Sequence, residues 1–262
     1  MKRFCCIALL LLTTASCSVK EIRDDCPCCL GLTVTSQGDS IFQKGNAWCC
    51  IFNGDGSQSD GSSLTGMDVR DTAVSYRIDP RRTVSAVVSN REIVAGEVVV
   101  PLGSEMTRLF AFRQDFVCTS EFVDGVIDSQ DKQYCTLDIH LTEAAMSFAP
   151  QLVISVDAPY NGTSFPSMEA HFGEFQCRAV FDVDGRVSIR IPRQGGEGAR
   201  LIVRKANAFT ATYDLYADMA MSGYDWNGAS MEDFSFPVGL NSITGTIEIL
   251  DWTPIEMGDY EF

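Results

Sequence analysis

The sequence predicts an all-β protein built from two tandem antiparallel β-sandwich domains. Apolar and polar residues alternate over many short segments, and a strand presents successive side chains to opposite faces of its sheet. Glycine, asparagine, aspartate and proline separate these segments at intervals of roughly ten residues, which is typical of sandwiches. The chain has 262 residues, which suits one large domain or two of about 115 residues once a leader is removed.

The expected strands start at residue 30 and continue almost to the C-terminus. The most regular is the segment 175–183, in which Phe175, Cys177 and Phe181 share one face. Asp184-Gly185 follows it and is typical of a tight hairpin turn. Only Thr142–Ala149 and Tyr216–Met221 have a helical composition, and both are short. The other expected strands are 30–34, 48–52, 84–88, 98–102, 109–112, 137–141, 152–156, 187–191, 201–203, 209–216 and 243–249.

The polar stretch Asp115–Gln133 is the best candidate for a linker between the domains. We place the boundary near Asp131, so the N-terminal domain spans 26–131 and the C-terminal domain spans 132–262. Residues 17–25 form a short, charged tether in front of the first domain. Residues 1–16 form a signal peptide.

The first seventeen residues carry the most specific signal in the chain. Lys2 and Arg3 precede an apolar run from Phe4 to Leu12, as in a secretory signal peptide. That run is too short to cross a bilayer, which needs about 20 residues. The sequence Thr14-Ala15-Ser16-Cys17 resembles a lipobox, so we expect lipidation of Cys17 and a bacterial lipoprotein anchored by its acyl chains. An ordinary secretory signal that contains a cysteine is the alternative.

The charge of the chain argues against a nucleic-acid partner. The net charge is −15, and it becomes −17 once Lys2 and Arg3 are removed with the signal peptide. Phosphate backbones repel so acidic a protein. The tether Ser18–Asp25 is itself acidic and resembles the export signal of surface lipoproteins in Bacteroidetes, although a plain hydrophilic spacer explains it equally well.

Eleven cysteines invite a disulfide or metal interpretation. Cys5 and Cys6 leave with the signal peptide, and Cys17 carries lipid. An oxidising compartment permits disulfides between the others, but their pairing does not follow from the sequence. A zinc site would draw on Cys26, Cys28, Cys29, Cys49 and Cys50. Several of these fall in apolar strand patterns typical of buried thiols, so we expect no metal. The eight remaining cysteines are Cys26, Cys28, Cys29, Cys49, Cys50, Cys118, Cys135 and Cys177.

We expect no enzymatic activity and no cofactor. Of the two histidines, His140 should face solvent between Ile139 and Leu141, and His171 has no recognisable partner. The sequence contains no HExxH, GxSxG or P-loop motif. The stretch 53–60 loosely resembles a calcium loop but lacks the closing glutamate, so we expect a hairpin loop there.

One family resemblance covers nearly the whole chain. The segment Cys17–Leu32 (CSVKEIRDDCPCCLGL) has a lipobox cysteine, a charged spacer and the motif Asp25-Cys26-Pro27 before an apolar strand. In these features it resembles the fimbrillin-associated anchor lipoproteins of Bacteroidales. The segment Gly38–Asp71 departs from the family pattern and is richer in glycine and serine. Segments that resemble the family's C-terminal domain are 137–141, 152–162, 213–226, 233–238 and 243–252.

The resemblance implies two transthyretin-like sandwiches and a role in type V fimbriae. It implies an outer-membrane lipoprotein, exposed on the surface, that tethers and terminates the fimbria and whose partners are the stalk pilin subunits. Donor-strand pairing between subunits would use main-chain hydrogen bonds at a sheet edge. The candidate donor strand carries Ile243, Ile247, Ile249 and Trp252, and an ordinary closing strand of the second domain is the alternative for the same residues. Strict alternation separates Trp252 from the isoleucines unless a bulge shifts the register.

A basic residue that is missing favours an anchor over a stalk subunit. Stalk pilins similar to this family lose their first strand to an arginine-specific protease. Here no arginine lies between Arg23 and Arg70, so we expect the first strand to be retained, as in an anchor or accessory subunit. The alternative function is a surface glycan-binding or nutrient-capture lipoprotein, which an exposed aromatic platform near Trp226 would favour.

Overall fold

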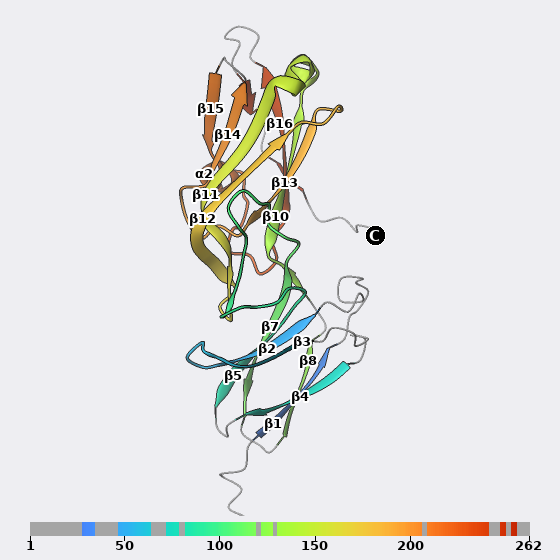
Figure 1. Ribbon diagram of the computed structural model, residues 1–262, viewed down its shortest axis with the longest axis vertical. Coiled ribbons are helices and arrows are strands. Elements are labelled where there is room, and N and C mark those ends of the chain that lie inside the picture. Colours follow the sequence, from blue (N-terminus) through green and yellow to red (C-terminus); the bar gives the residue numbers. More distant parts are fainter. Residues whose placement is uncertain are drawn as a thin grey trace, which may run out of the picture.

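The computed structural model places most of the residues that it describes in β-strands. In Figure 1 the strands form two groups, one above the other along the long axis of the molecule. Cys17, Ile243 and Trp252 lie outside the described residues. The structure describes residues 28–34, 47–63, 72–78, 82–118, 122–127, 130–205, 209–240, 247–249 and 253–255.

The lower group is a sandwich of two sheets. One sheet has the strand order β4-β1-β8, and the other has the order β3-β2-β5-β7-β9. Their bounds are β1 Cys28–Val34, β2 Trp48–Asn53, β3 Gln58–Ser63, β4 Thr72–Ile78, β5 Thr83–Ser89, β7 Phe110–Val117, β8 Phe122–Ile127 and β9 Asp131–Lys132.

The upper group is a second sandwich. One sheet has the order β13-β10-β16-β17, with β18 also paired to β16, and the other has the order β12-β11-β14-β15, with β6 also paired to β11. The bounds are β6 Glu97–Val99, β10 Tyr134–Leu141, β11 Leu152–Ser164, β12 Glu169–Val180, β13 Arg186–Pro192, β14 Arg200–Lys205, β15 Phe209–Asp214, β16 Asp233–Leu240, β17 Ile247–Ile249 and β18 Thr253–Ile255.

The expected all-β sandwich class is confirmed, and two ladders add a detail that alternation does not reveal. Strands β1 and β8 are parallel, as are β10 and β16. Alternation along a strand reports which side chains face the core, and it is the same for parallel and antiparallel partners. The domain boundary near Asp131 stays a prediction.

The hairpin expected at Asp184-Gly185 is wrong, although a tight turn does lie there. Gly185 has a φ of 69°, and its amide bonds the Asp182 carbonyl at 3.1 Å. The strands on either side belong to different sheets, since β12 pairs with β11 and β13 pairs with β10. The turn therefore carries the chain across the sandwich.

The two helical segments are as short as their composition indicates. Glu143–Gln151 forms a 3-10 helix, η3, and Leu215–Met221 forms helix α2. The carboxylate of Asp214 caps α2 by accepting from the Ala217 amide at 3.0 Å. Within the described part of the chain, neither helix has the length and apolar character needed to cross a bilayer.

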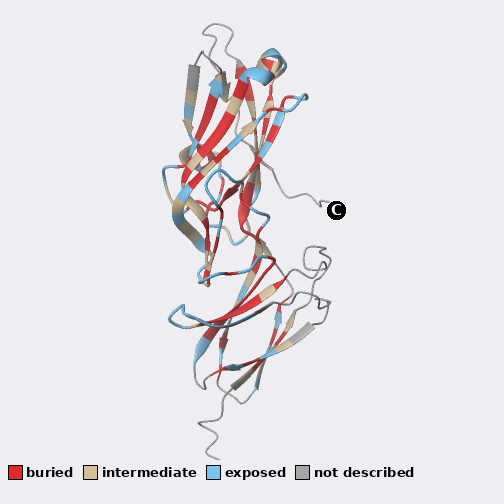
Figure 2. Cartoon of the chain, in the orientation of Figure 1, coloured by how far each residue is buried: buried red, intermediate tan, exposed pale blue. Residues whose placement is uncertain are grey.

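Buried residues form two hydrophobic cores, seen as the red bands of Figure 2. The smaller core lies in the first sandwich and includes Leu30, Leu32 and Val84. The larger core fills the second sandwich and also takes in Phe52, Val98 and other residues that precede β7. Apolar packing is therefore continuous from the second sandwich into the adjoining part of the first.

Candidate functional site

Strand β1 occupies the centre of its sheet. It pairs antiparallel with β4 and parallel with β8, so that Leu30 lies between Tyr76 and Val123. The side chains of Leu30 and Leu32 are completely buried in the smaller core. Both hydrogen-bonding edges of β1 are thus paired, and its removal would open an apolar groove between β4 and β8.

The outer face of β1 is closely covered as well. A Cβ atom added to Gly31 would lie 2.6 Å from Asp124 Oδ1 and 3.1 Å from Cζ of Phe122. Only glycine fits under these two side chains of β8 without displacing them. The first strand is therefore fitted to its neighbours on both faces.

The terminal strands β17 and β18 run antiparallel along β16. Val238 lies opposite Ile249, and Ser235 lies opposite Thr253. The terminal segment therefore advances four positions while β16 advances three, a shift of one residue between the two ladders. Ile249 is partly buried against the larger core. This arrangement pairs the segment within its own chain.

Deleting residues 243–262 tests whether this segment closes the second sandwich. We expect the truncated chain to lose about 2 kcal/mol or more of unfolding free energy, because Ile249 and the ladder along β16 are lost. Urea unfolding of the full and truncated chains measures the difference. A truncated chain that keeps its full stability would instead show that the second sandwich does not need this segment, as expected of a strand donated to a neighbour.

A segment between β5 and β7 joins the two sandwiches, and we call residues 90–109 the strap. Its strand β6 extends the sheet of the second sandwich, with Val98 opposite Thr163 on β11. A Cβ atom on Gly162 would lie 2.2 Å from the Val98 carbonyl oxygen, so the close approach depends on glycine. Val98, Met106 and other strap residues are buried in the larger core. In Figure 1 this green segment lies between the two groups of strands.

Polar contacts hold the rest of the strap against the second sandwich. The Met106 amide donates to the Arg190 carbonyl at 2.9 Å, and Arg190 Nε donates back to the Met106 carbonyl at 2.9 Å. The Arg190 guanidinium also pairs with Glu105 at 2.8 Å. Further along the strap, the Gly103 amide donates to the Gln176 carbonyl at 2.8 Å. These contacts fix the strap to the second sandwich.

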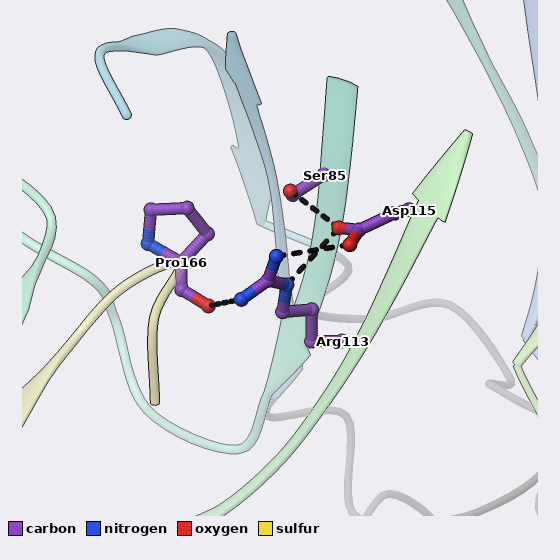
Figure 3. Close-up of polar contacts among 4 residues, drawn as sticks. All are labelled: Ser85, Arg113, Asp115 and Pro166. Atoms are coloured by element: carbon purple, nitrogen blue, oxygen red, sulfur yellow. Dashed lines mark hydrogen bonds and ion pairs between the residues drawn. The ribbon is translucent and has the colours of Figure 1, made fainter. Parts of the chain in front are cut away.

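Arg113 on β7 forms a second polar link between the sandwiches (Figure 3). Its Nη1 atom donates to the Pro166 carbonyl at 2.9 Å, and its Nη2 atom pairs with Asp115 at 2.9 Å. Ser85 Oγ donates to the same carboxylate at 2.6 Å. The hydrogen bond from Arg113, more than any other contact, lowers the pKa of Asp115. The charged carboxylate in turn orients the guanidinium toward Pro166.

Arg193 is the centre of a buried polar network in the second sandwich. The residue is 6% exposed. Its guanidinium donates to the carbonyls of Trp226, Gly228 and Ala229 at 2.9, 2.7 and 3.1 Å. It also donates to Gln133 Oε1 at 3.1 Å. Burial lowers the pKa of Arg193. The network fixes the loop between α2 and β16 to the start of β10.

A buried ion pair continues this network. Lys132 bonds Asp233, and the Thr136 amide donates to the same carboxylate oxygen at 2.6 Å. The Lys132 amide donates to Ser230 Oγ at 3.1 Å. The entry of the chain into the second sandwich is therefore held on several sides by polar contacts.

The aromatic platform that would favour glycan binding near Trp226 is absent. Trp226 is 2% exposed. Its ring stacks on Tyr216 at a centroid distance of 5.5 Å and meets Tyr224 edge-on at 4.8 Å. Sequence reasoning treated Trp226 as a possible surface residue because nothing in its neighbourhood indicates which tertiary partners cover it.

The histidines differ from expectation at one position. His140 is half-buried on β10, whereas His171 has partners that the sequence did not reveal. His171 Nδ1 lies 3.2 Å from Ser164 Oγ and 3.2 Å from Oε1 of Glu97 on the strap. Both contacts use the same ring nitrogen, whereas a catalytic relay uses the two nitrogens for different partners. The cluster therefore links the strap to the second sandwich and is not arranged for nucleophilic catalysis.

The cysteines and the loop 53–60 are the groups that the sequence offered as possible metal ligands. Burial raises the pKa of Cys135 to about 12, which keeps it a thiol. In the loop after β2, Asp55 Oδ1 accepts from the amide of Ser57 at 2.9 Å and from its hydroxyl at 2.6 Å. These hydrogen bonds lower the pKa of Asp55. In the part of the chain that the structure describes, no three or more His, Cys, Asp or Glu side chains gather to hold a metal ion.

Comparison with known proteins identifies the fold. No protein-family model and no curated protein matches the sequence. The chain is similar in structure to the fimbrial anchor protein Mfa2 from Porphyromonas gingivalis, with a TM-score of 0.64 and 9% identity over 87% of this chain and 97% of that chain. The likeness expected from the sequence is confirmed at the level of the fold.

Two structures from Bacteroides thetaiotaomicron share this fold. A candidate polysaccharide-binding protein has a TM-score of 0.60 and 9% identity, covering 86% of this chain and 98% of that chain. A candidate adhesin has a TM-score of 0.58 and 12% identity, covering 88% of this chain and 99% of that chain. In each case nearly the whole of the other chain is covered, so the likeness extends over both sandwiches.

Proposed function

We propose that this chain, whose fold is shared with a fimbrial anchor protein, is the anchor subunit of a type V fimbria, or an accessory subunit of the same kind. Lipid on Cys17 holds it in the outer membrane, and the two sandwiches connect that membrane to the fimbrial stalk. The stalk pilin subunits are its partners. The role is structural and includes no catalytic step.

The observation that carries this proposal is the position of β1. A subunit that accepts a neighbour's strand needs an open groove, and in this chain β1 fills the place between β4 and β8. No arginine lies between Arg23 and Arg70, so an arginine-specific protease has no site in the stretch that directly follows β1. A subunit whose groove stays filled by its own strand ends a polymer.

The joint between the sandwiches suits a tether. The N-terminus leads to the membrane, and tension on the fimbria passes through both sandwiches. The strap and the Arg113 link give the joint main-chain ladders, charged hydrogen bonds and buried apolar residues. Each of these resists separation of the sandwiches under load.

The rival function, a surface glycan-binding or nutrient-capture lipoprotein, draws support from the candidate polysaccharide-binding protein of the same fold. An exposed aromatic platform at Trp226 would have favoured glycan binding, but the Trp226 ring is buried. We therefore place the anchor function first.

Replacing Cys17 with alanine tests the anchor directly. We expect the variant to incorporate no palmitate and to leave the outer-membrane fraction, because the acyl chains provide the attachment. The cells should then shed fimbriae into the medium. Electron microscopy of cell-bound fimbriae and labelling with a palmitate analogue measure both effects. The matched control is Cys29→Ala, which replaces a cysteine on β1 in the first sandwich. This variant should keep the lipid on Cys17. Normal labelling and normal fimbriae in Cys17→Ala would contradict the proposal.

A further inference from the structure

The outer face of the sheet β12-β11-β14-β15 carries a cavity that the anchor function does not use. It has a volume of about 480 Å³ and is lined by residues of all four strands and of the loop before β14. Volumes of this size are typical of small-ligand sites. The cavity opens on the second sandwich, away from the strand β1 and the terminal strands that concern assembly.

The polar groups of the cavity include both acceptors and donors. Asp157 on β11 lies between Gln176 on β12 and Arg200 on β14 in the ladders of this sheet. Gln176 Nε2 donates to Asp157 Oδ1 at 3.1 Å, which orients the carboxylate. Within the described residues, the side chains of Glu174 and Arg200 make no hydrogen bond or ion pair, although both line the cavity. Their bonding capacity is open to a ligand.

An exposed aromatic ring completes the site. Phe172 is 76% exposed and packs edge-on against Tyr160, with ring centroids 5.8 Å apart. The edge contact orients the ring while leaving a face in solvent. Gly173 follows it, and a Cβ atom there would lie 2.4 Å from Asn161 Oδ1, so the backbone beside the ring is held closely. A large exposed apolar side chain beside unused polar groups is a feature of binding surfaces.

We propose that this cavity binds a neutral saccharide. A pyranose ring has an apolar C–H face that packs on an aromatic side chain, here Phe172. Each sugar hydroxyl both donates and accepts hydrogen bonds. It can donate to a carboxylate, here Glu174, and accept from a cationic donor, here Arg200. The charged residues that line the cavity are Asp157, Glu174 and Arg200. Their net charge is negative, which disfavours a ligand that carries phosphate or sulfate. The cavity lies on a sheet face, whereas an extended peptide pairs with a sheet edge.

The test is saturation-transfer NMR on the full chain purified in detergent, with N-acetyllactosamine, chitotriose and maltotriose as probes. We expect transfer to the ring protons of at least one of them. Phe172→Ala and Glu174→Gln should each weaken binding about tenfold, as expected for losing one good contact. Val183→Ala is the matched control, because Val183 is 93% exposed and does not line the cavity.

Two outcomes would overturn the proposal. One is the absence of transfer to all three saccharides at millimolar concentration, and the other is equal transfer in Phe172→Ala and the unchanged chain. Fimbria counts on cells carrying Phe172→Ala separate this site from the anchor function. We expect those counts to be normal, so loss of saccharide binding and loss of anchoring are distinguishable.

Discussion

Replacing Arg193 with alanine is expected to lower the unfolding free energy by about 3 kcal/mol or more, because hydrogen bonds from a buried charged donor are strong and two of the acceptor residues, Gln133 and Trp226, stay buried. Three backbone carbonyls and Gln133 Oε1 accept from this guanidinium. Without it, the carbonyls of Trp226 and Gly228 lose this donor, whereas the Ala229 carbonyl keeps a hydrogen bond from Gln133 Nε2 at 3.1 Å. Urea unfolding, followed by tryptophan fluorescence, measures the loss and also reports on buried Trp226.

A control separates this effect from the loss of any arginine. Arg204 on β14 is exposed, so Arg204→Ala should change the unfolding free energy by no more than about 0.5 kcal/mol. Arg193→Lys should fall between the two, since a lysine ammonium cannot reach all four acceptors in the fork geometry of a guanidinium. A loss below about 1 kcal/mol in Arg193→Ala would contradict the central role of this residue.

Shortening both leucines of β1 to alanine is expected to unfold the first sandwich. Each buried Leu→Ala change costs about 2–5 kcal/mol, and a domain has about 5–15 kcal/mol in total. Leu30 and Leu32 are completely buried, and the double change leaves a cavity at the centre of the smaller core. Near-ultraviolet circular dichroism and urea unfolding follow the change. On cells, the double variant should hold fewer fimbriae, because the tether is broken between membrane and stalk.

The outward-facing neighbour provides the matched control for β1. Thr33→Ala on the same strand removes a side chain that is only partly buried, so its effect should stay within about 1 kcal/mol. If the double leucine variant unfolds with the same midpoint as Thr33→Ala, β1 is not an integral strand of the sandwich. The proposed function would then lose the observation that carries it.

The sequence predicted the strands well wherever alternation was regular. Leu137 and Ile139 on β10 are completely buried, as are Ile154 and Val156 on β11. The alternation of period two directly reports which side chains leave water, so local sequence is sufficient for this part of the fold. The helical segments were also located, since η3 and α2 lie within a few residues of their predicted positions.

The candidate assembly site was predicted in part. The leader, the tether and the retention of the first strand were inferred from residues close together in the sequence, and the structure adds that β1 is central in its sheet. Ile247 and Ile249 lie on β17, beside β16. The one-residue register shift before β18 was considered possible from the order of Ile249, Leu250 and Trp252, but the ladders were needed to establish it.

The sequence by itself determined that this protein is all-β, which residues face its cores, and that its leader resembles that of a lipoprotein. Only the tertiary structure decided which strands are neighbours, as in the parallel pairing of β1 with β8 and the turn at Gly185 that changes sheets. It also decided that Glu97 lies beside His171 and that Arg193 holds the loop containing Trp226. The reason is physical: alternation records the environment of a side chain, whereas a partner is chosen by distance and geometry between residues far apart in the chain.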